Sequence, residues 1–236
     1  MPEFTGKPVT VAAAGLATAL SCIPSFAQTQ ELRNTVEVGY AAILFNTDSG
    51  ELTGPAGTTP PGATADLRNT GTLGLVYERN VGGPWSIVFQ GGVPPIVAFD
   101  GAGSAAALGK VGSARAWFPA LMVAWSLPRL AGFQPYVGAG LNYTFFTDNR
   151  ITESYTAAFG GTSSDSRLKN SLGPIAKLGV EVPFARRWVF DLSYTRYWIK
   201  TTATIRTDTP GAGVIERRID VRADPDVFAV MVGYRF

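Results

Sequence analysis

The sequence predicts an all-β fold, an eight-stranded antiparallel transmembrane β-barrel of the outer membrane. Bulky apolar residues alternate with small or polar residues along most of the chain, as expected of strands with two unlike faces. After residue 27 there is no window of 18 consecutive apolar residues, so a membrane-spanning helix is not expected. Only 16% of the residues are charged, whereas glycine occurs 27 times in 236 residues. Together these features favour many strands that cross a membrane.

The N-terminal residues 1–27 have the pattern of a secretory signal peptide that is cleaved on export. Residues 9–20 form its apolar stretch, and Ala27 is a small residue at the expected cleavage site. A membrane anchor is disfavoured because this stretch has about a dozen residues, against roughly 20 needed to span a bilayer. Cys22 raises the alternative of a lipoprotein, but the residues before it do not match a lipobox. Residues 28–236 are therefore expected to form a single β-barrel domain.

The alternation divides the rest of the chain into eight expected strands. They lie near residues 34–45, 69–79, 85–97, 114–128, 133–147, 169–183, 187–206 and 227–236. In the first, Val38 and Tyr40 lie on the face opposite Glu37. An eight-stranded barrel has an interior only just wide enough for side chains, so the bulky face must point outward into lipid. Closure of the barrel leaves no unpaired strand edge in the hydrocarbon.

Aromatic residues at the strand ends are expected to form two girdles, as in other transmembrane barrels. The periplasmic girdle comprises Trp85, Trp125, Phe133, Trp188 and Phe236. The outer girdle comprises Phe45, Trp117, Phe145, Trp198 and Phe228. Short links near residues 79–84, 127–132 and 183–187 fit periplasmic turns. Longer links rich in Gly, Thr, Ser and Pro, at residues 46–68, 98–113, 148–168 and 207–214, are expected to be extracellular loops.

Composition disfavours several classes of function. The chain has no histidine, the commonest general base and metal ligand, and its one cysteine cannot form an internal disulfide. We therefore expect neither an enzyme nor a bound metal or cofactor. A net charge of +2 without a run of Lys or Arg argues against nucleic acid as a partner.

The residues expected to face the lumen differ between its two halves. In the periplasmic half, charged side chains are expected to form a polar plug, because buried charges must pair or stay hydrated: Glu37, Glu78, Lys177, Glu181, Asp191 and Arg235. In the outer half the expected lining is apolar: Ile43, Val88, Phe118, Met122, Phe146, Ile175, Tyr197 and Met231. The alternative for the charges is a core that serves stability alone.

Three stretches, taken in their order along the chain, carry a resemblance to a known family. They are FQPYVGAGLNYTFF at residues 133–146, RW at 187–188 before a strand that ends in TTA at 201–203, and VRADPDVF at 221–228 leading to GYRF. This pattern resembles the OmpW family of outer-membrane proteins, AlkL-type relatives included. The resemblance implies an eight-stranded barrel that assists uptake of small hydrophobic molecules through a narrow, partly apolar lumen. A departure is WIK at residues 198–200, where family members often have Asp-Ile-Asp.

Three prolines suggest an exit for such molecules. Pro94, Pro95 and Pro119 cannot donate hydrogen bonds to a strand ladder, and they fall in the outer half of the third and fourth expected strands. We expect a lateral opening there, with outer-membrane lipids and small hydrophobic solutes as partners. Phe236 is expected to engage the outer-membrane assembly machinery. The alternative is that the prolines merely end strands, and that the protein is a passive structural or adhesion barrel displaying extracellular loops.

Overall fold

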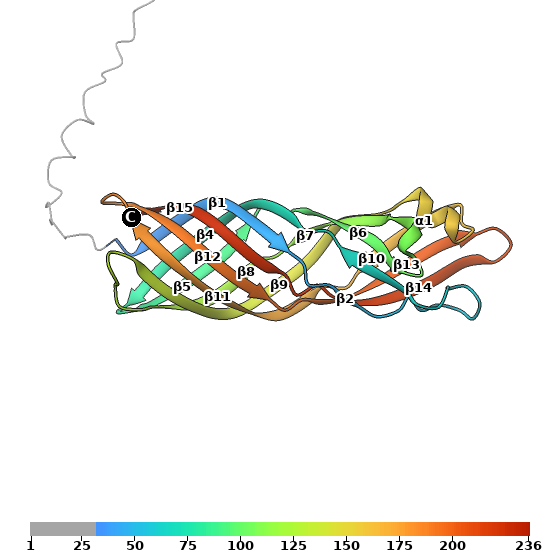
Figure 1. The fold of residues 1–236 in the computed structure, drawn as a ribbon, viewed down its shortest axis with the longest axis horizontal. Coiled ribbons are helices and arrows are strands. Elements are labelled where there is room, and N and C mark those ends of the chain that lie inside the picture. Colours follow the sequence, from blue (N-terminus) through green and yellow to red (C-terminus); the bar gives the residue numbers. More distant parts are fainter. Residues whose placement is uncertain (1–31) are drawn as a thin grey trace, which may run out of the picture. The chain divides into compact units, whose positions relative to one another are not determined.

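Long antiparallel strands wind around a common axis, and the last returns to pair with the first (Figure 1). In the computed structural model, which describes residues 32–236, the ring consists of β1 (Asn34–Leu44), β4 (Thr70–Gly82), β5 (Trp85–Gly92), β8 (Ala120–Ser126), β9 (Gln134–Ile151), β11 (Ser171–Pro183), β12 (Trp188–Tyr197) and β15 (Asp226–Arg235). β1 pairs with β4 and β15, and β9 pairs with β11 to close the ring. The predicted closed barrel of eight strands is confirmed. The predicted signal peptide, residues 1–27 with Cys22, lies outside the described residues.

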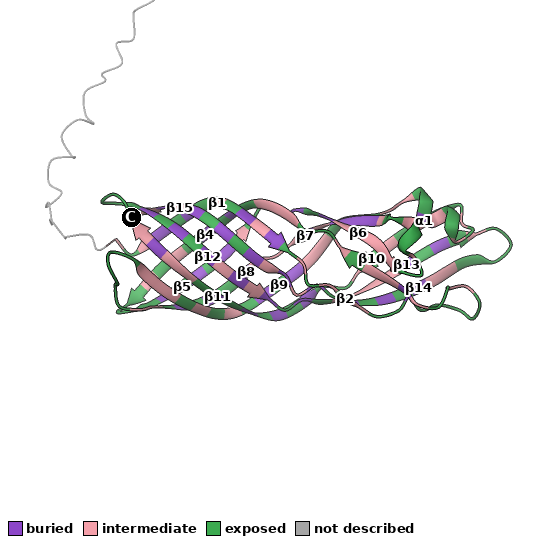
Figure 2. Ribbon diagram, in the orientation of Figure 1, coloured by how far each residue is buried: buried purple, intermediate pink, exposed green. Residues whose placement is uncertain are grey.

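The two faces of each strand have the predicted orientation. Buried and exposed residues alternate along the ring strands (Figure 2). Leu121 is 58% exposed although it is apolar, whereas the charged Asp191 is 0% exposed. This is the reverse of a soluble barrel, and lipid is the environment in which it is stable. The described part of the chain holds no helix that is long and apolar enough to span a bilayer.

The aromatic girdles agree with prediction except at one residue. At the periplasmic end Trp85 stacks on Trp125, with ring centroids 6.2 Å apart. At the outer end Trp117 stacks on Phe145 at 5.6 Å. The placement of Phe45 in the outer girdle is wrong, because it packs against the apolar interior. It lies two residues after Ile43 and therefore shares the inward face of the strand.

The outer half of the barrel is built from further strands, several of which lie where loops were expected. β3 (Ala63–Leu67), β6 (Ile96–Gly103) and β7 (Lys110–Trp117) form a sheet with the upper part of β9. β2 (Asp48–Ser49), β10 (Ser163–Leu168), β13 (Lys200–Thr209) and β14 (Gly213–Arg222) form a second sheet. The predicted extracellular loops are therefore too long, since their outward polar residues belong to strands facing water. Two short helices, η1 (Ala106–Leu108) and α1 (Glu153–Ala158), lie near the outer tip (Figure 1).

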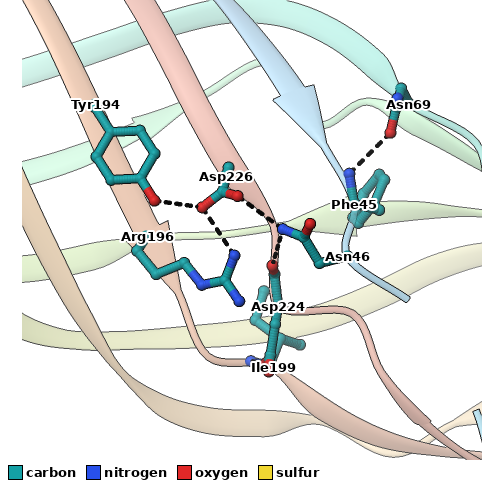
Figure 3. Close-up of polar contacts among 8 residues, drawn as sticks. All are labelled: Phe45, Asn46, Asn69, Tyr194, Arg196, Ile199, Asp224 and Asp226. Atoms are coloured by element: carbon teal, nitrogen blue, oxygen red, sulfur yellow. Dashed lines mark hydrogen bonds and ion pairs between the residues drawn. The ribbon is translucent and has the colours of Figure 1, made fainter. Parts of the chain in front are cut away.

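Two aspartates hold the junction between the ring and the second sheet (Figure 3). The Asp226 carboxylate accepts hydrogen bonds from Tyr194 Oη at 2.6 Å, Arg196 Nη1 at 2.9 Å and Asn46 Nδ2 at 2.8 Å. Asp224, at a φ of 29°, accepts from the backbone N–H of Ile199 at 2.9 Å. These bonds connect the residues that follow β1 with β12 and β15. They lie where β12 gives way to β13 and where β14 gives way to β15. They give a structural reason for the DPD sequence at residues 224–226.

Candidate functional site

The floor of the lumen is a cluster of charged side chains contributed by five strands. It contains all of the predicted plug residues, Glu37 from β1, Glu78 from β4, Lys177 and Glu181 from β11, Asp191 from β12 and Arg235 from β15. Carboxylate oxygens of three of them, Glu37, Glu78 and Glu181, lie within 4.8 Å of one another. Arg235 forms an ion pair with Glu181. The cluster therefore presents ionisable groups across the barrel interior.

Two residues that the sequence analysis did not single out complete the floor. Tyr136 donates a hydrogen bond to Asp191 Oδ2 at 2.7 Å, and its ring lies 5.6 Å from Lys177 Nζ. Gln90 accepts from Lys177 Nζ at 3.3 Å and donates to Tyr197 Oη at 2.6 Å. Gln90 thus links the charged floor to the apolar region above it. Strand parity was the available signal, since Gln90 shares the inward face of Val88.

An apolar chamber, here called the side chamber, lies directly above the floor. Its inner lining includes Ile43, Phe118, Tyr197 and Met231, and residues 91–95 form its outer wall. Val88, Met122 and Ile175, also predicted to line the lumen, are buried in the same apolar core. The chamber thus extends from the barrel interior to the wall that contains Pro94 and Pro95.

Backbone pairing in this wall is interrupted. The ladder between β5 and β8 ends at the pair Gln90–Ala120, and the ladder between β6 and β7 begins at Ile96–Arg115. Between the two ladders, a single backbone hydrogen bond connects the two edges of the wall: Ala116 N donates to Pro95 O at 3.0 Å. Neither Pro94 nor Pro95 has an N–H to donate.

Pro119 lies on the opposite edge of this gap, between β7 and β8. Its carbonyl accepts a hydrogen bond from Tyr143 N at 2.9 Å, so it takes part in pairing with β9. The lining of the side chamber includes Pro94 and Pro95 but does not extend to Pro119. The three predicted prolines are therefore not equivalent.

A second apolar hollow, here called the upper chamber, lies between the two outer sheets. Its lining includes Phe45, Phe99, Phe146, Ile199 and Ile219. Phe118 lines this chamber and also the side chamber, and its ring centroid lies 6.2 Å from that of Tyr197. Phe118 therefore stands at the junction of the two chambers.

The outer tip carries a polar group that the sequence analysis missed. Arg217, on β14, is only 2% exposed, and its guanidinium lies 4.3 Å from the ring centroid of Phe159. Phe159 follows α1 and packs on Tyr155, with the two ring centroids 4.5 Å apart. Burial raises the pKa of Tyr155 to about 12, although Arg217 opposes this shift. The guanidinium was not found from the sequence, because Arg217 lies between the loop expected at residues 207–214 and the strand expected at 227–236 and was assigned to neither.

The closed ring, the exposed apolar belt and the charged interior define an outer-membrane β-barrel protein. The OmpW family model matches residues 91–236, and the chain belongs to that family. Outer membrane protein W of Vibrio cholerae is 29% identical over 228 residues, which cover 96% of this chain and 99% of that protein. Dibenzothiophene metabolism operon protein PahQ of Pseudomonas aeruginosa is 26% identical over 92% of this chain and 95% of that protein.

A solved structure gives the same picture of the fold. The crystal structure of the outer membrane protein OprG from Pseudomonas aeruginosa matches with a TM-score of 0.75 and 26% identity. The match covers 86% of this chain and 96% of that one. Localisation in the outer membrane, predicted from the inside-out pattern, is confirmed by these relatives.

Proposed function

We propose that the protein assists the passive uptake of small hydrophobic molecules, which enter the upper chamber, pass Phe118 and leave sideways into the membrane. The observation that carries this proposal is the contact between the two apolar chambers at Phe118, together with the arrival of the side chamber at the interrupted wall. Entry is favourable because burial of apolar surface yields about 25 cal/mol per Å².

The charged floor supports a lateral exit over a vertical one. An apolar solute that moved downward would have to separate Arg235 from Glu181 and break the hydrogen bond between Tyr136 and Asp191. Buried charges and polar groups that lose their partners are costly. A solute that moved through the wall at residues 91–95 would pass from one apolar environment to another, so no energy source is needed.

One relative supports the class of solute. The name of PahQ links that protein to an operon for the metabolism of dibenzothiophene, an aromatic compound of low polarity. The proposed function involves no covalent step, in keeping with a sequence that lacks histidine. Contact of Phe236 with the assembly machinery stays a prediction.

The proposal is tested by uptake of an apolar solute such as naphthalene into proteoliposomes. Their outer leaflet contains lipopolysaccharide, because a plain phospholipid bilayer passes such solutes unaided. We expect faster uptake than in vesicles without protein, and slower uptake when Pro94 and Pro95 are both replaced by alanine. Uptake equal to that of protein-free vesicles would favour the passive barrel that only displays its outer surface.

A further inference from the structure

A buried cation on β14 lies next to the lining of the upper chamber and has no carboxylate partner among the described residues. Arg217 is 2% exposed, yet it is absent from the ion pairs formed among residues 32–236. Arginine is almost never fully buried unless it is paired. An unpaired cation in this position therefore calls for a partner that residues 32–236 do not supply.

The contacts of the guanidinium leave part of its donor capacity unused. Nε donates to the backbone carbonyl of Thr58 at 3.1 Å, and the planar group lies over the ring of Phe159. Nη1 is buried and has no hydrogen-bond partner among the described residues. The hydroxyl of Tyr155, which is itself buried, also has no partner there. A guanidinium with five donors and a phenol hydroxyl suit a carboxylate with two acceptor oxygens.

The position of Arg217 relates this donor set to the proposed path. On β14 it lies on the inward face two residues before Ile219, and it pairs with Ile205 of β13. Both isoleucines line the upper chamber. Arg217 itself lines a hollow at the outer tip, together with residues 57–60. The guanidinium thus lies between a hollow open to water and a chamber lined by apolar side chains.

We propose that Arg217 and Tyr155 form a site for the anionic head of an amphiphile, a carboxylate carried on a hydrocarbon or aromatic body. The carboxylate takes over the hydrogen bond that Thr58 now accepts, and the apolar body extends into the upper chamber. The inference rests on the proposed function and names a substrate class for the same path. If instead Arg217 serves only to hold the segment around Thr58 in place, the site has no preference for anions.

A matched pair of ligands separates these possibilities. Naphthalene-2-carboxylate and 2-methylnaphthalene have the same ring system but differ in charge, and each is titrated into the full chain in lipid nanodiscs by calorimetry. In Arg217→Gln we expect at least tenfold weaker binding of the carboxylate and less than a twofold change for the neutral ligand. The control is Arg206→Gln, because Arg206 is exposed and already paired with Glu216 at 3.1 Å. It should change neither affinity by more than twofold.

Equal loss of both ligands in Arg217→Gln would overturn the site in favour of a structural role, and unchanged carboxylate binding would overturn it outright. If that variant fails to fold, Arg217→Lys decides, since it keeps the charge but not the two-pronged geometry. We expect it to weaken carboxylate binding three- to tenfold, and unchanged affinity would refute the proposal. Failure of wild-type protein to speed naphthalene uptake, with carboxylate binding still dependent on Arg217, would overturn only the proposed function.

Discussion

Blocking the interrupted wall should stop transport without disturbing the fold, and Gly91 is the position at which to do so. Gly91 lines the side chamber, and a Cβ atom added there would meet nothing within 4 Å. The neighbouring Gly92 is unsuitable, because a Cβ there would lie 2.3 Å from the carbonyl oxygen of Leu73. We therefore choose Gly91→Phe. Gly91 pairs with the exposed Leu75, so the added phenyl ring lies on the lipid-facing side of the wall, over the outer mouth of the expected exit.

The size of the effect follows from the energy needed to move that ring aside. Forcing an extra bulky group into a space that is already filled costs about 1–3 kcal/mol. A solute that leaves past the ring meets this cost at the transition state. Since about 1.4 kcal/mol corresponds to a factor of ten, uptake should fall roughly 5- to 100-fold.

The assay is the uptake of naphthalene into vesicles containing lipopolysaccharide, normalised to folded protein from unheated electrophoresis. The matched control is Ile87→Phe, because Ile87 lies on the same lipid-facing side of the same strand, 44% exposed, but where β5 is still paired with β8. It should leave uptake within twofold of wild type. Wild-type uptake by Gly91→Phe would refute the exit at this wall, and equal losses in both variants would show a general effect of the added ring.

Three further substitutions test the contact between the two chambers, the hydrogen bonds of Asp226 and the charged floor. Phe118→Ala should widen the passage between the chambers and raise uptake several-fold, measured in the same vesicles; slower uptake would contradict its place on the path. Asp226→Asn removes the charge of a carboxylate that accepts three side-chain hydrogen bonds. The free energy of unfolding, measured in urea, should fall by about 1–2 kcal/mol. The control Asp148→Asn, at an exposed ion pair, should lower it by less than about 0.5 kcal/mol. Glu181→Ala leaves Arg235 without its partner and should destabilise the barrel by about 3 kcal/mol while uptake stays unchanged; a marked change in uptake would mean that the floor takes part in transport.

The sequence by itself determined the orientation of the strands and the contents of the lumen. Strand parity is a local property, so the inward direction of Glu37 and Asp191 follows from the outward direction of their apolar neighbours. The small interior of an eight-stranded barrel then excludes the opposite arrangement. For the same reason the predicted plug and lumen residues could be selected without knowing which strands are neighbours.

The tertiary structure alone decided where the ladders break and how far the wall extends beyond the membrane. A strand that faces water on its outer side has the same Ser- and Thr-rich pattern as a loop, which is why β10 was not foreseen and β13 was expected only as the end of a strand over residues 187–206. All three prolines border the gap, but the Pro119 carbonyl accepts a bond from β9 whereas the Pro95 carbonyl accepts one across the gap from Ala116. The contact of Arg217 with Thr58 joins residues 159 positions apart in sequence. Such contacts depend on long-range strand pairing, which a local sequence pattern does not specify.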